Sequence, residues 1–139
     1  MGNTLAVVGE RWTLLVLREA FLGVRRFEQI QRNTGVARNI LADRLSTLVL
    51  HGILRRERNS DRPERFEYRL TEKGLDLYPV LLTIMDWGAK HAGGKAMELT
   101  HKNCGATVMP HLACPECGEH VQARDMHAVR TDAALGKSA

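Results

Sequence analysis

Apolar residues recur at helical spacing through the first third of the chain. Over residues 12–22 one such face holds Trp12, Leu15, Val16 and Glu19. The segment therefore predicts a largely buried helix that ends at Gly23, and a second short helix is expected over 27–33. Thr34-Gly35 then breaks the pattern, because glycine supplies the positive φ that a tight turn between two helices needs.

A third helix is predicted from about Ala37 to His51, with Gly52 as its stop. Its buried stripe falls within about 60° of the helix surface and consists of Leu41, Leu45 and Leu48. The opposite side carries Asn39, Asp43 and Ser46, with Arg38 and Ala42 between the two faces. Two short helices, a glycine turn and a helix with a polar outer face are typical of a helix-turn-helix.

After Gly52 the period changes from helical to alternating. The segments "ILRRER" (53–58) and "RFEYRL" (65–70) are rich in strand formers, and "NSDRPE" between them is typical of a turn. This pattern predicts a β-hairpin with a charged tip. A helix-turn-helix followed at once by a hairpin is a winged helix, so the expected fold class is mainly α with a small β-hairpin wing.

A long helix is expected to begin at Thr71, which can cap free backbone N–H groups. Gly74 weakens its first turn, and Pro79 either kinks this helix or marks a new N-terminus. Its apolar side is too large for a small winged helix to cover alone, and it is interpreted either as core or as the seam of a dimer. The residues of this side are Leu77, Leu81, Ile84 and Trp87.

Three long stretches of the chain resemble the HxlR family of bacterial winged-helix transcription regulators, within the MarR-like superfamily. They are "GERWTLLVLREAFLGVRRFEQI" (9–30), "ILADRLSTLVLHGIL" (40–54) and "FEYRLTEKGLDLYPVL" (66–81). The resemblance covers roughly residues 3–92. It implies a DNA-binding homodimer whose first and last helices form the interface. Many members carry a cysteine before the first helix. Here "MGNTLAVVGERW" contains none, so sensing by that thiol is not carried over.

The positive charges behind the formal net charge of +4 are unevenly distributed along the chain. Arginines gather in two blocks, Arg25, Arg26, Arg32, Arg38 and Arg44 and then Arg55, Arg56, Arg58, Arg62 and Arg65. Clustered arginine indicates a polyanionic partner, with a solvated basic surface as the alternative.

In a winged helix the third helix enters the major groove and presents its N-terminal outer residues to base edges. Arg38 suits guanine and Asn39 suits adenine, whereas Asp43 accepts from cytosine, steers a neighbouring arginine or only stabilises the helix start. The wing tip suits the minor groove or its phosphates, and arginines of the front helix suit phosphates. The predicted DNA-binding residues are Arg26, Arg32, Arg38, Asn39, Ala42, Asp43, Ser46, Arg62 and Arg65.

All three cysteines lie in "HKNCGATVMPHLACPECG" (101–118), in two pairs with the x2 spacing that lets two donors chelate from one turn. The predicted ligands of a closed, structural Zn²⁺ site are His101, Cys104, Cys114 and Cys117. His111 or His120 could replace His101. The alternatives are a tail without metal, a redox switch or thiol exchange at the Cys114–Cys117 pair, and a zinc knuckle that binds a protein partner.

The sequence thus predicts a winged helix-turn-helix for DNA binding and dimerisation over 1–97, a zinc-ribbon-like knuckle segment over 98–121 and a flexible tail over 122–139. The predicted partners are double-stranded DNA and a second copy of the chain, and no small-molecule effector is identified. Neither a membrane span nor a signal peptide is found, and the cytoplasm is the expected compartment. No phosphate loop or catalytic triad points to an enzyme. The predicted function is a sequence-specific transcription regulator that acts as a repressor.

Overall fold

The computed structural model describes residues 1–94 and 97–129 of the 139. The chain falls into two compact units that divide after Lys95. In the described ranges, no helix combines the length and the apolar character needed to cross a membrane. The predicted tail over 122–139 lies partly outside the described residues, and within it Ala123–Asp125 forms a short 3-10 helix.

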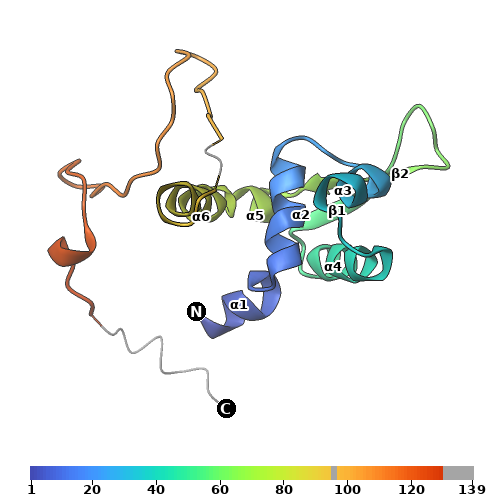
Figure 1. The fold of residues 1–139 in the computed structure, drawn as a ribbon, viewed down its shortest axis with the longest axis horizontal. Helices are drawn as coiled ribbons and strands as arrows, with labels where there is room; N and C mark the ends of the chain where they lie inside the picture. Colours follow the sequence, from blue (N-terminus) through green and yellow to red (C-terminus); the bar gives the residue numbers. More distant parts are fainter. Residues whose placement is uncertain (95–96, 130–139) are drawn as a thin grey trace. The chain divides into compact units, whose positions relative to one another are not determined.

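The first unit is a winged helix-turn-helix, as predicted (Figure 1). Its elements in chain order are α1 (Gly2–Val8), α2 (Arg11–Phe21), α3 (Phe27–Thr34), α4 (Arg38–Leu50), β1 (Leu54–Arg58), β2 (Phe66–Leu70), α5 (Glu72–Leu75) and α6 (Tyr78–His91). The hairpin pairs antiparallel, with Leu54 opposite Leu70 and Arg58 opposite Phe66. The helix α1 was not predicted from the sequence.

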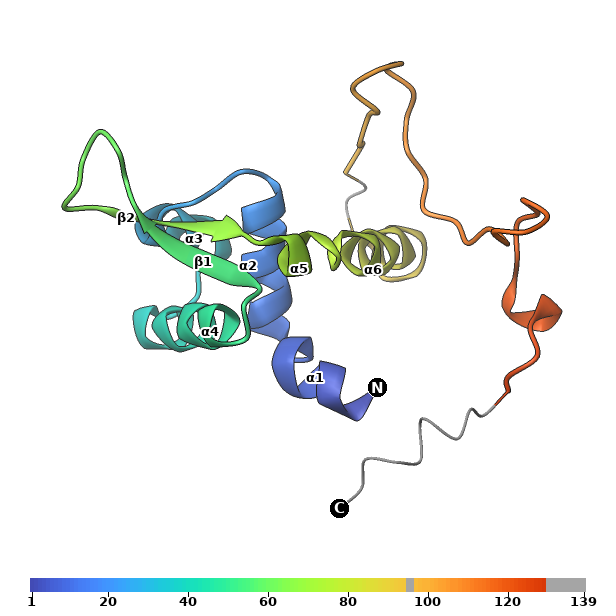
Figure 2. The same cartoon turned by 180° about the vertical axis from the view of Figure 1, so that it is seen from behind.

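The helix α2 is the central element of this unit and packs against α3, α4, α6 and β2 (Figures 1 and 2). Glu10 caps its N-terminus, because the carboxylate accepts from the backbone N–H groups of Trp12 at 2.9 Å and Thr13 at 3.3 Å. The hydrophobic core that surrounds α2 consists of Val8, Val16, Leu17, Ile30, Val36, Leu41, Leu45, Leu48, Ile53 and Leu54.

A buried carboxylate joins the first two helices of the helix-turn-helix. Glu19 is only 4% exposed, and it accepts hydrogen bonds from Asn33 Nδ2 at 2.7 Å and Arg18 Nη2 at 2.8 Å. Buried carboxylates are costly unless paired. The bond from Asn33 links α3 to α2, and Arg18, which lies on α2 itself, pairs with the charge of Glu19. Gly35, with φ of 71°, then turns the chain toward α4.

The segment "LTEKG" joins the wing to the end of α4. The backbone N–H of Thr71 donates to the carbonyl of Ile53 at 3.1 Å, and its hydroxyl accepts from Gly74 N at 3.1 Å as the cap of α5. Lys73 Nζ donates to the carbonyl of His51 at 2.7 Å. Of the two interpretations of Pro79, a kink or a new N-terminus, the second is confirmed, because α6 starts at Tyr78 with Pro79 in its first turn.

Gly74 is expected to tolerate no side chain. A Cβ at this position would lie 2.2 Å from the carbonyl oxygen of Ile53 and 3.0 Å from Leu70 Cδ2. We therefore expect Gly74→Ala to lower the free energy of unfolding by about 1–3 kcal/mol, through overpacking. The matched control is Gly88→Ala in α6, where a Cβ meets nothing within 4 Å and the gain in helix propensity is about 1 kcal/mol. Urea unfolding followed by circular dichroism measures both, and equal shifts would contradict the prediction.

The wing buries the acidic residue Glu67, although simple alternation of apolar and polar residues predicts that it faces solvent. Glu67 is 8% exposed, whereas Phe66 is 37% exposed. Asn59 Nδ2 donates to the Glu67 carboxylate, and so does Arg69 Nη2 at 3.0 Å. These hydrogen bonds, with the charges of Arg69 and Arg25, lower the pKa of Glu67 below its ordinary value although burial opposes the shift.

This lowered pKa makes the stability of the wing depend on pH. The unfolded chain binds a proton at Glu67 near pH 4.5 and the folded chain only at lower pH. The stabilising contribution is therefore present above about pH 4.5 and is lost as the pH falls through the folded pKa. We expect Glu67→Gln to lower the urea midpoint at neutral pH, and the gap to the wild type to narrow in acid. A gap that stays constant across this range would contradict the assignment.

Candidate nucleic-acid interface

The helix α4 separates an apolar face from a polar one. Leu41, Leu45 and Leu48 are fully buried at 0% exposure. The five predicted base-reading residues are all exposed, and they are Arg38, Asn39, Ala42, Asp43 and Ser46. Arg38 is the first residue of α4, so the outward row begins at the helix N-terminus, the end that winged helices present to base edges.

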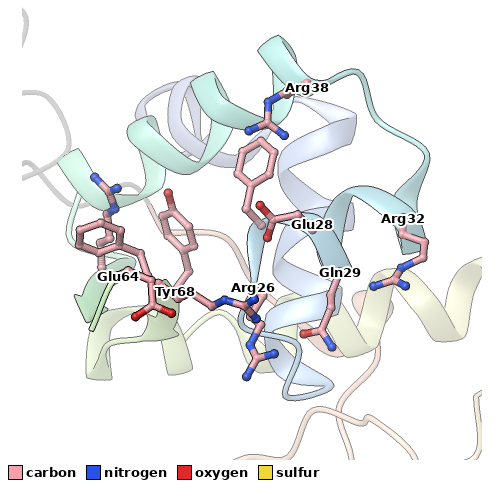
Figure 3. A pocket seen from close by; sticks show the side chains of 11 residues that line it. Arg26, Glu28, Gln29, Arg32, Arg38, Glu64 and Tyr68 are labelled. Atoms are coloured by element: carbon pink, nitrogen blue, oxygen red, sulfur yellow. The ribbon is translucent and has the colours of Figure 1, made fainter. Parts of the chain in front are cut away.

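A basic groove of about 650 Å³ lies beside the start of α4, between α3 and the wing (Figure 3). Arginines from three elements and the wing tip face it, against the two carboxylates of Glu28 and Glu64. The lining residues are Arg26, Phe27, Glu28, Gln29, Arg32, Arg38, Arg56, Glu64, Arg65, Phe66 and Tyr68. Four residues predicted from the sequence, Arg26, Arg32, Arg38 and Arg65, are thus brought to one concave surface.

Aromatic rings hold two of these guanidinium groups. Arg38 Cζ lies 4.8 Å from the centroid of the Phe27 ring, and Arg56 Cζ lies 3.7 Å from that of Phe66. A guanidinium stacked on a ring loses little further freedom when it binds a phosphate or a base edge. Sequence reasoning missed Arg56 and both rings as parts of the site. The arginine block over 55–65 was a signal for Arg56. The strand register, which pairs Arg56 with Tyr68 and so places it near Phe66, could not be read from the sequence.

Asp43 forms an ion pair with Arg44 on the surface of α4. Among the interpretations of Asp43, this contact corresponds to a carboxylate that steers a neighbouring arginine. A second hollow of about 380 Å³ adjoins the pair and is also lined by Asn39 and the side chains of Glu10 and Trp12. The outward side of α4 is therefore flanked by the basic groove at its start and by a mixed-charge hollow along its length.

The tip of the wing is an ordered loop. Asn59 Oδ1 accepts from the backbone N–H groups of Asp61 and Arg62, each at 2.9 Å. Asn59 N donates to the carbonyl of Arg65 at 2.8 Å, and Arg65 N donates to that of Arg62 at 2.9 Å. The loop projects away from the helices (Figures 1 and 2). Both arginines are exposed, and Arg65 lines the groove whereas Arg62 does not.

The predicted metal donors lie in the second unit as two separate pairs. His101 Nδ1 and Cys104 Sγ are 3.3 Å apart. In the other pair, backbone N–H groups of Cys117 and Glu116, together with the Cys117 thiol, lower the pKa of Cys114 below its ordinary value. All three thiols are free of disulfides. Within residues 1–94 and 97–129, no three donors gather about one point.

The fold, the exposed outer face of α4 and the basic groove define a helix-turn-helix protein that binds DNA. The chain belongs to the HxlR-like helix-turn-helix family, whose model matches residues 7–96. The family identifies it as a DNA-binding transcription regulator, as the resemblance implied.

Relatives share both the sequence and the fold. An uncharacterised HTH-type transcriptional regulator of Mycobacterium tuberculosis is 47% identical over 129 residues, which is 91% of this chain and 82% of that protein. The regulator YvaP of Bacillus subtilis is 32% identical over 85 residues, 60% of this chain and 79% of YvaP.

Among solved structures, PA1607, described as a candidate transcription factor, superposes with a TM-score of 0.80 at 34% identity and covers 91% of each chain. The redox regulator HypR in its reduced form gives a TM-score of 0.60 at 30% identity, over 66% of this chain and 91% of HypR. A share of 91% is larger than residues 1–96 can supply. The similarity to the mycobacterial regulator and to PA1607 therefore extends into the second unit.

Proposed function

We propose that this chain is a repressor that binds its operator as a homodimer, in the cytoplasm, with α4 in the major groove and the wing on the flanking minor groove or its phosphates. The observation that carries this proposal is the basic groove beside the N-terminus of α4. Its arginines come from α3, α4, β1 and the wing tip, and together they form a concave cationic surface that a DNA backbone can follow. Where the operator overlaps a promoter, a bound dimer excludes other proteins from the same DNA and so represses transcription.

Two groups of side chains divide the work. Arg38 and Asn39 at the start of α4 can pair bidentately with guanine and adenine, which gives sequence preference. Arg26, Arg32, Arg56 and Arg65 face the phosphates, which adds affinity without sequence information. In the free protein the ring of Phe27 orients the guanidinium of Arg38, and the ring of Phe66 orients that of Arg56.

The dimer is supported by an apolar stripe on α6. Val80, Ile84 and Trp87 recur at helical spacing and are 46%, 47% and 62% exposed. Leu81, on another side of the same helix, is buried. Exposed apolar residues at this spacing are typical of a helix that pairs with a partner. Of the two sequence interpretations, core and dimer seam, the exposure of Ile84 and Trp87 favours the seam.

Titration of labelled duplex DNA from the chain's own upstream region tests the function. If a dimer neutralises about six to eight phosphates, log K should fall with log salt at a slope of about −5 to −7. We expect tight binding to one upstream fragment and weak, salt-sensitive binding to random duplex. A reporter driven by that fragment should be silenced by the chain. Protein that binds no duplex fragment even at low salt would contradict the proposal.

A further inference from the structure

The second unit contains an internal repeat of 13 residues. We define the first loop as residues 98–108, "ELTHKNCGATV", and the second loop as residues 111–121, "HLACPECGEHV". Each is closed by an isolated antiparallel bridge, Thr100 with Thr107 and Ala113 with His120. Each bridge residue of the second loop lies 13 positions after its equivalent in the first.

The backbone hydrogen bonds of the two loops match one for one. Three bonds define each loop, and their lengths agree within about 0.3 Å. In the first loop they run from His101 N to Ala106 O (2.9 Å), Gly105 N to His101 O (2.7 Å) and Val108 N to Leu99 O (2.7 Å). In the second they run from Cys114 N to Glu119 O (2.9 Å), Gly118 N to Cys114 O (2.8 Å) and Val121 N to Leu112 O (3.0 Å).

The repeat decides which residues are equivalent as donors. His101 matches Cys114, and Cys104 matches Cys117, so each loop offers two N or S donors at the first and fourth positions of the same turn. The turns end alike, because Gly105 and Gly118 both have positive φ, of 71° and 74°. That conformation lets the chain fold back so that both donors of a loop lie on one side.

The repeat also places His111 and His120 outside the donor positions. Their equivalents in the first loop are Glu98 and Thr107, which pair across the bridge because Thr107 Oγ1 donates to Glu98 Oε1 at 3.0 Å. His111 and His120 pair in the same way, with stacked rings whose centroids are 4.0 Å apart. They serve as a cross-strand pair that supports the second loop.

The described part of the second unit has no core. None of residues 97–129 is buried, and Cys114 is one of the few that are even half-buried. Two ordered turns without a core need a cross-link, because so short a segment buries too little apolar surface to hold itself. Three thiols cannot close both loops with disulfides, whereas one metal ion can join the two donor pairs.

We infer that the two loops together bind one Zn²⁺ through His101, Cys104, Cys114 and Cys117. Thiolate and imidazole donors, two from each turn, make the closed tetrahedral set that zinc prefers. In the structure the two pairs are separate half-sites, and binding of the ion brings them together. The first loop, with its His101–Cys104 contact, is the half that distinguishes this site from a simple CxxC thiol pair.

Zinc content of the full-length protein, purified under reducing conditions, tests this site. We expect one zinc per chain in the wild type. Cys104→Ser, Cys117→Ser and His101→Ala should each lose stoichiometric zinc, and His101→Cys should retain it because a thiolate replaces the imidazole. The matched controls His111→Ala and His120→Ala should keep one zinc. Cobalt replacement should give the charge-transfer bands of thiolate ligands in wild type, weakened in each cysteine variant.

Three results would overturn the assignment. The first is wild-type protein that takes up no zinc from a zinc-supplemented, reduced solution. The second is zinc that is lost in His111→Ala or His120→Ala but kept in His101→Ala. The third is a stoichiometry of one zinc per two chains, with a dimer mass that depends on the metal. The last would mean that each chain supplies one donor pair to a shared ion and leaves its other pair unused. Circular dichroism of the helices and DNA titration, run in parallel, separate failure of this site from failure of the proposed function.

Discussion

Replacing Arg38 with alanine is expected to weaken operator binding by about 1–3 kcal/mol for each half-site of the dimer, the discrimination of one good bidentate base contact. Affinity for random duplex should fall much less. Arg38 begins α4, and its guanidinium lies over the Phe27 ring, so the wild-type side chain enters the complex already oriented. Asn39→Ala should give the same pattern, with preference relaxed at a different base pair.

The matched control for this prediction is Arg62→Ala at the wing tip. Arg62 is exposed and lies outside the groove lining, so its contacts should be with phosphates. Its loss should weaken operator and random DNA about equally and reduce the magnitude of the dimer's salt slope by about 2, because one phosphate contact is lost from each chain. Anisotropy titrations of the three variants on both duplexes measure this. Equal losses on both duplexes for all three variants would contradict the division between base-reading and phosphate-binding residues.

Replacing Ile84 with glutamate is expected to produce a folded monomer. Ile84 is 47% exposed in the single chain, so a carboxylate there costs the monomer little, whereas a dimer seam would bury two unpaired charges. A monomer binds one half-site and loses the effective concentration that links the second, which lowers operator affinity by about 10²–10⁴-fold.

Light scattering and DNA titration measure both parts of the Ile84→Glu prediction. The matched control is Leu50→Glu, the same kind of change at the end of α4, where the leucine is 82% exposed and lies outside the α6 stripe. That variant should keep the mass and the affinity of the wild type. A dimeric Ile84→Glu protein with full affinity would remove the α6 stripe from the interface.

The helices α2, α3 and α4 could be predicted to within about two residues, because their apolar spacing and the glycine at 35 are local signals. The leucine stripe of α4 alone determines which side faces outward, and this is why the base-reading candidates are exposed as expected. The helix α1 was missed because "NTLAVV" is too short for its period to be read.

The rest of the site depended on contacts that lie far apart in the sequence. The ring of Phe66 meets Arg56 only through the strand register. Alternation suggests that an aromatic residue at 66 points inward, but Phe66 is 37% exposed and Glu67 only 8%, although Tyr68 and Leu70 pack against the core. Glu67 is buried because Asn59 and Arg69 supply donors for its carboxylate, and no local pattern announces such donors.

The junction at "LTEKG" joins the wing, α5 and α6 into one rigid body. Thr71, Lys73 and Gly74 fasten the start of α5 to the residues that end α4, and α6 follows two residues after α5. In the proposed dimer, a change in the angle between the two α6 helices is therefore transmitted to both wings and both α4 helices. The separation of the two α4 helices must match a whole number of turns of B-DNA, each about 34 Å. A compound that changes the angle between the α6 helices therefore changes which operators the dimer can bind.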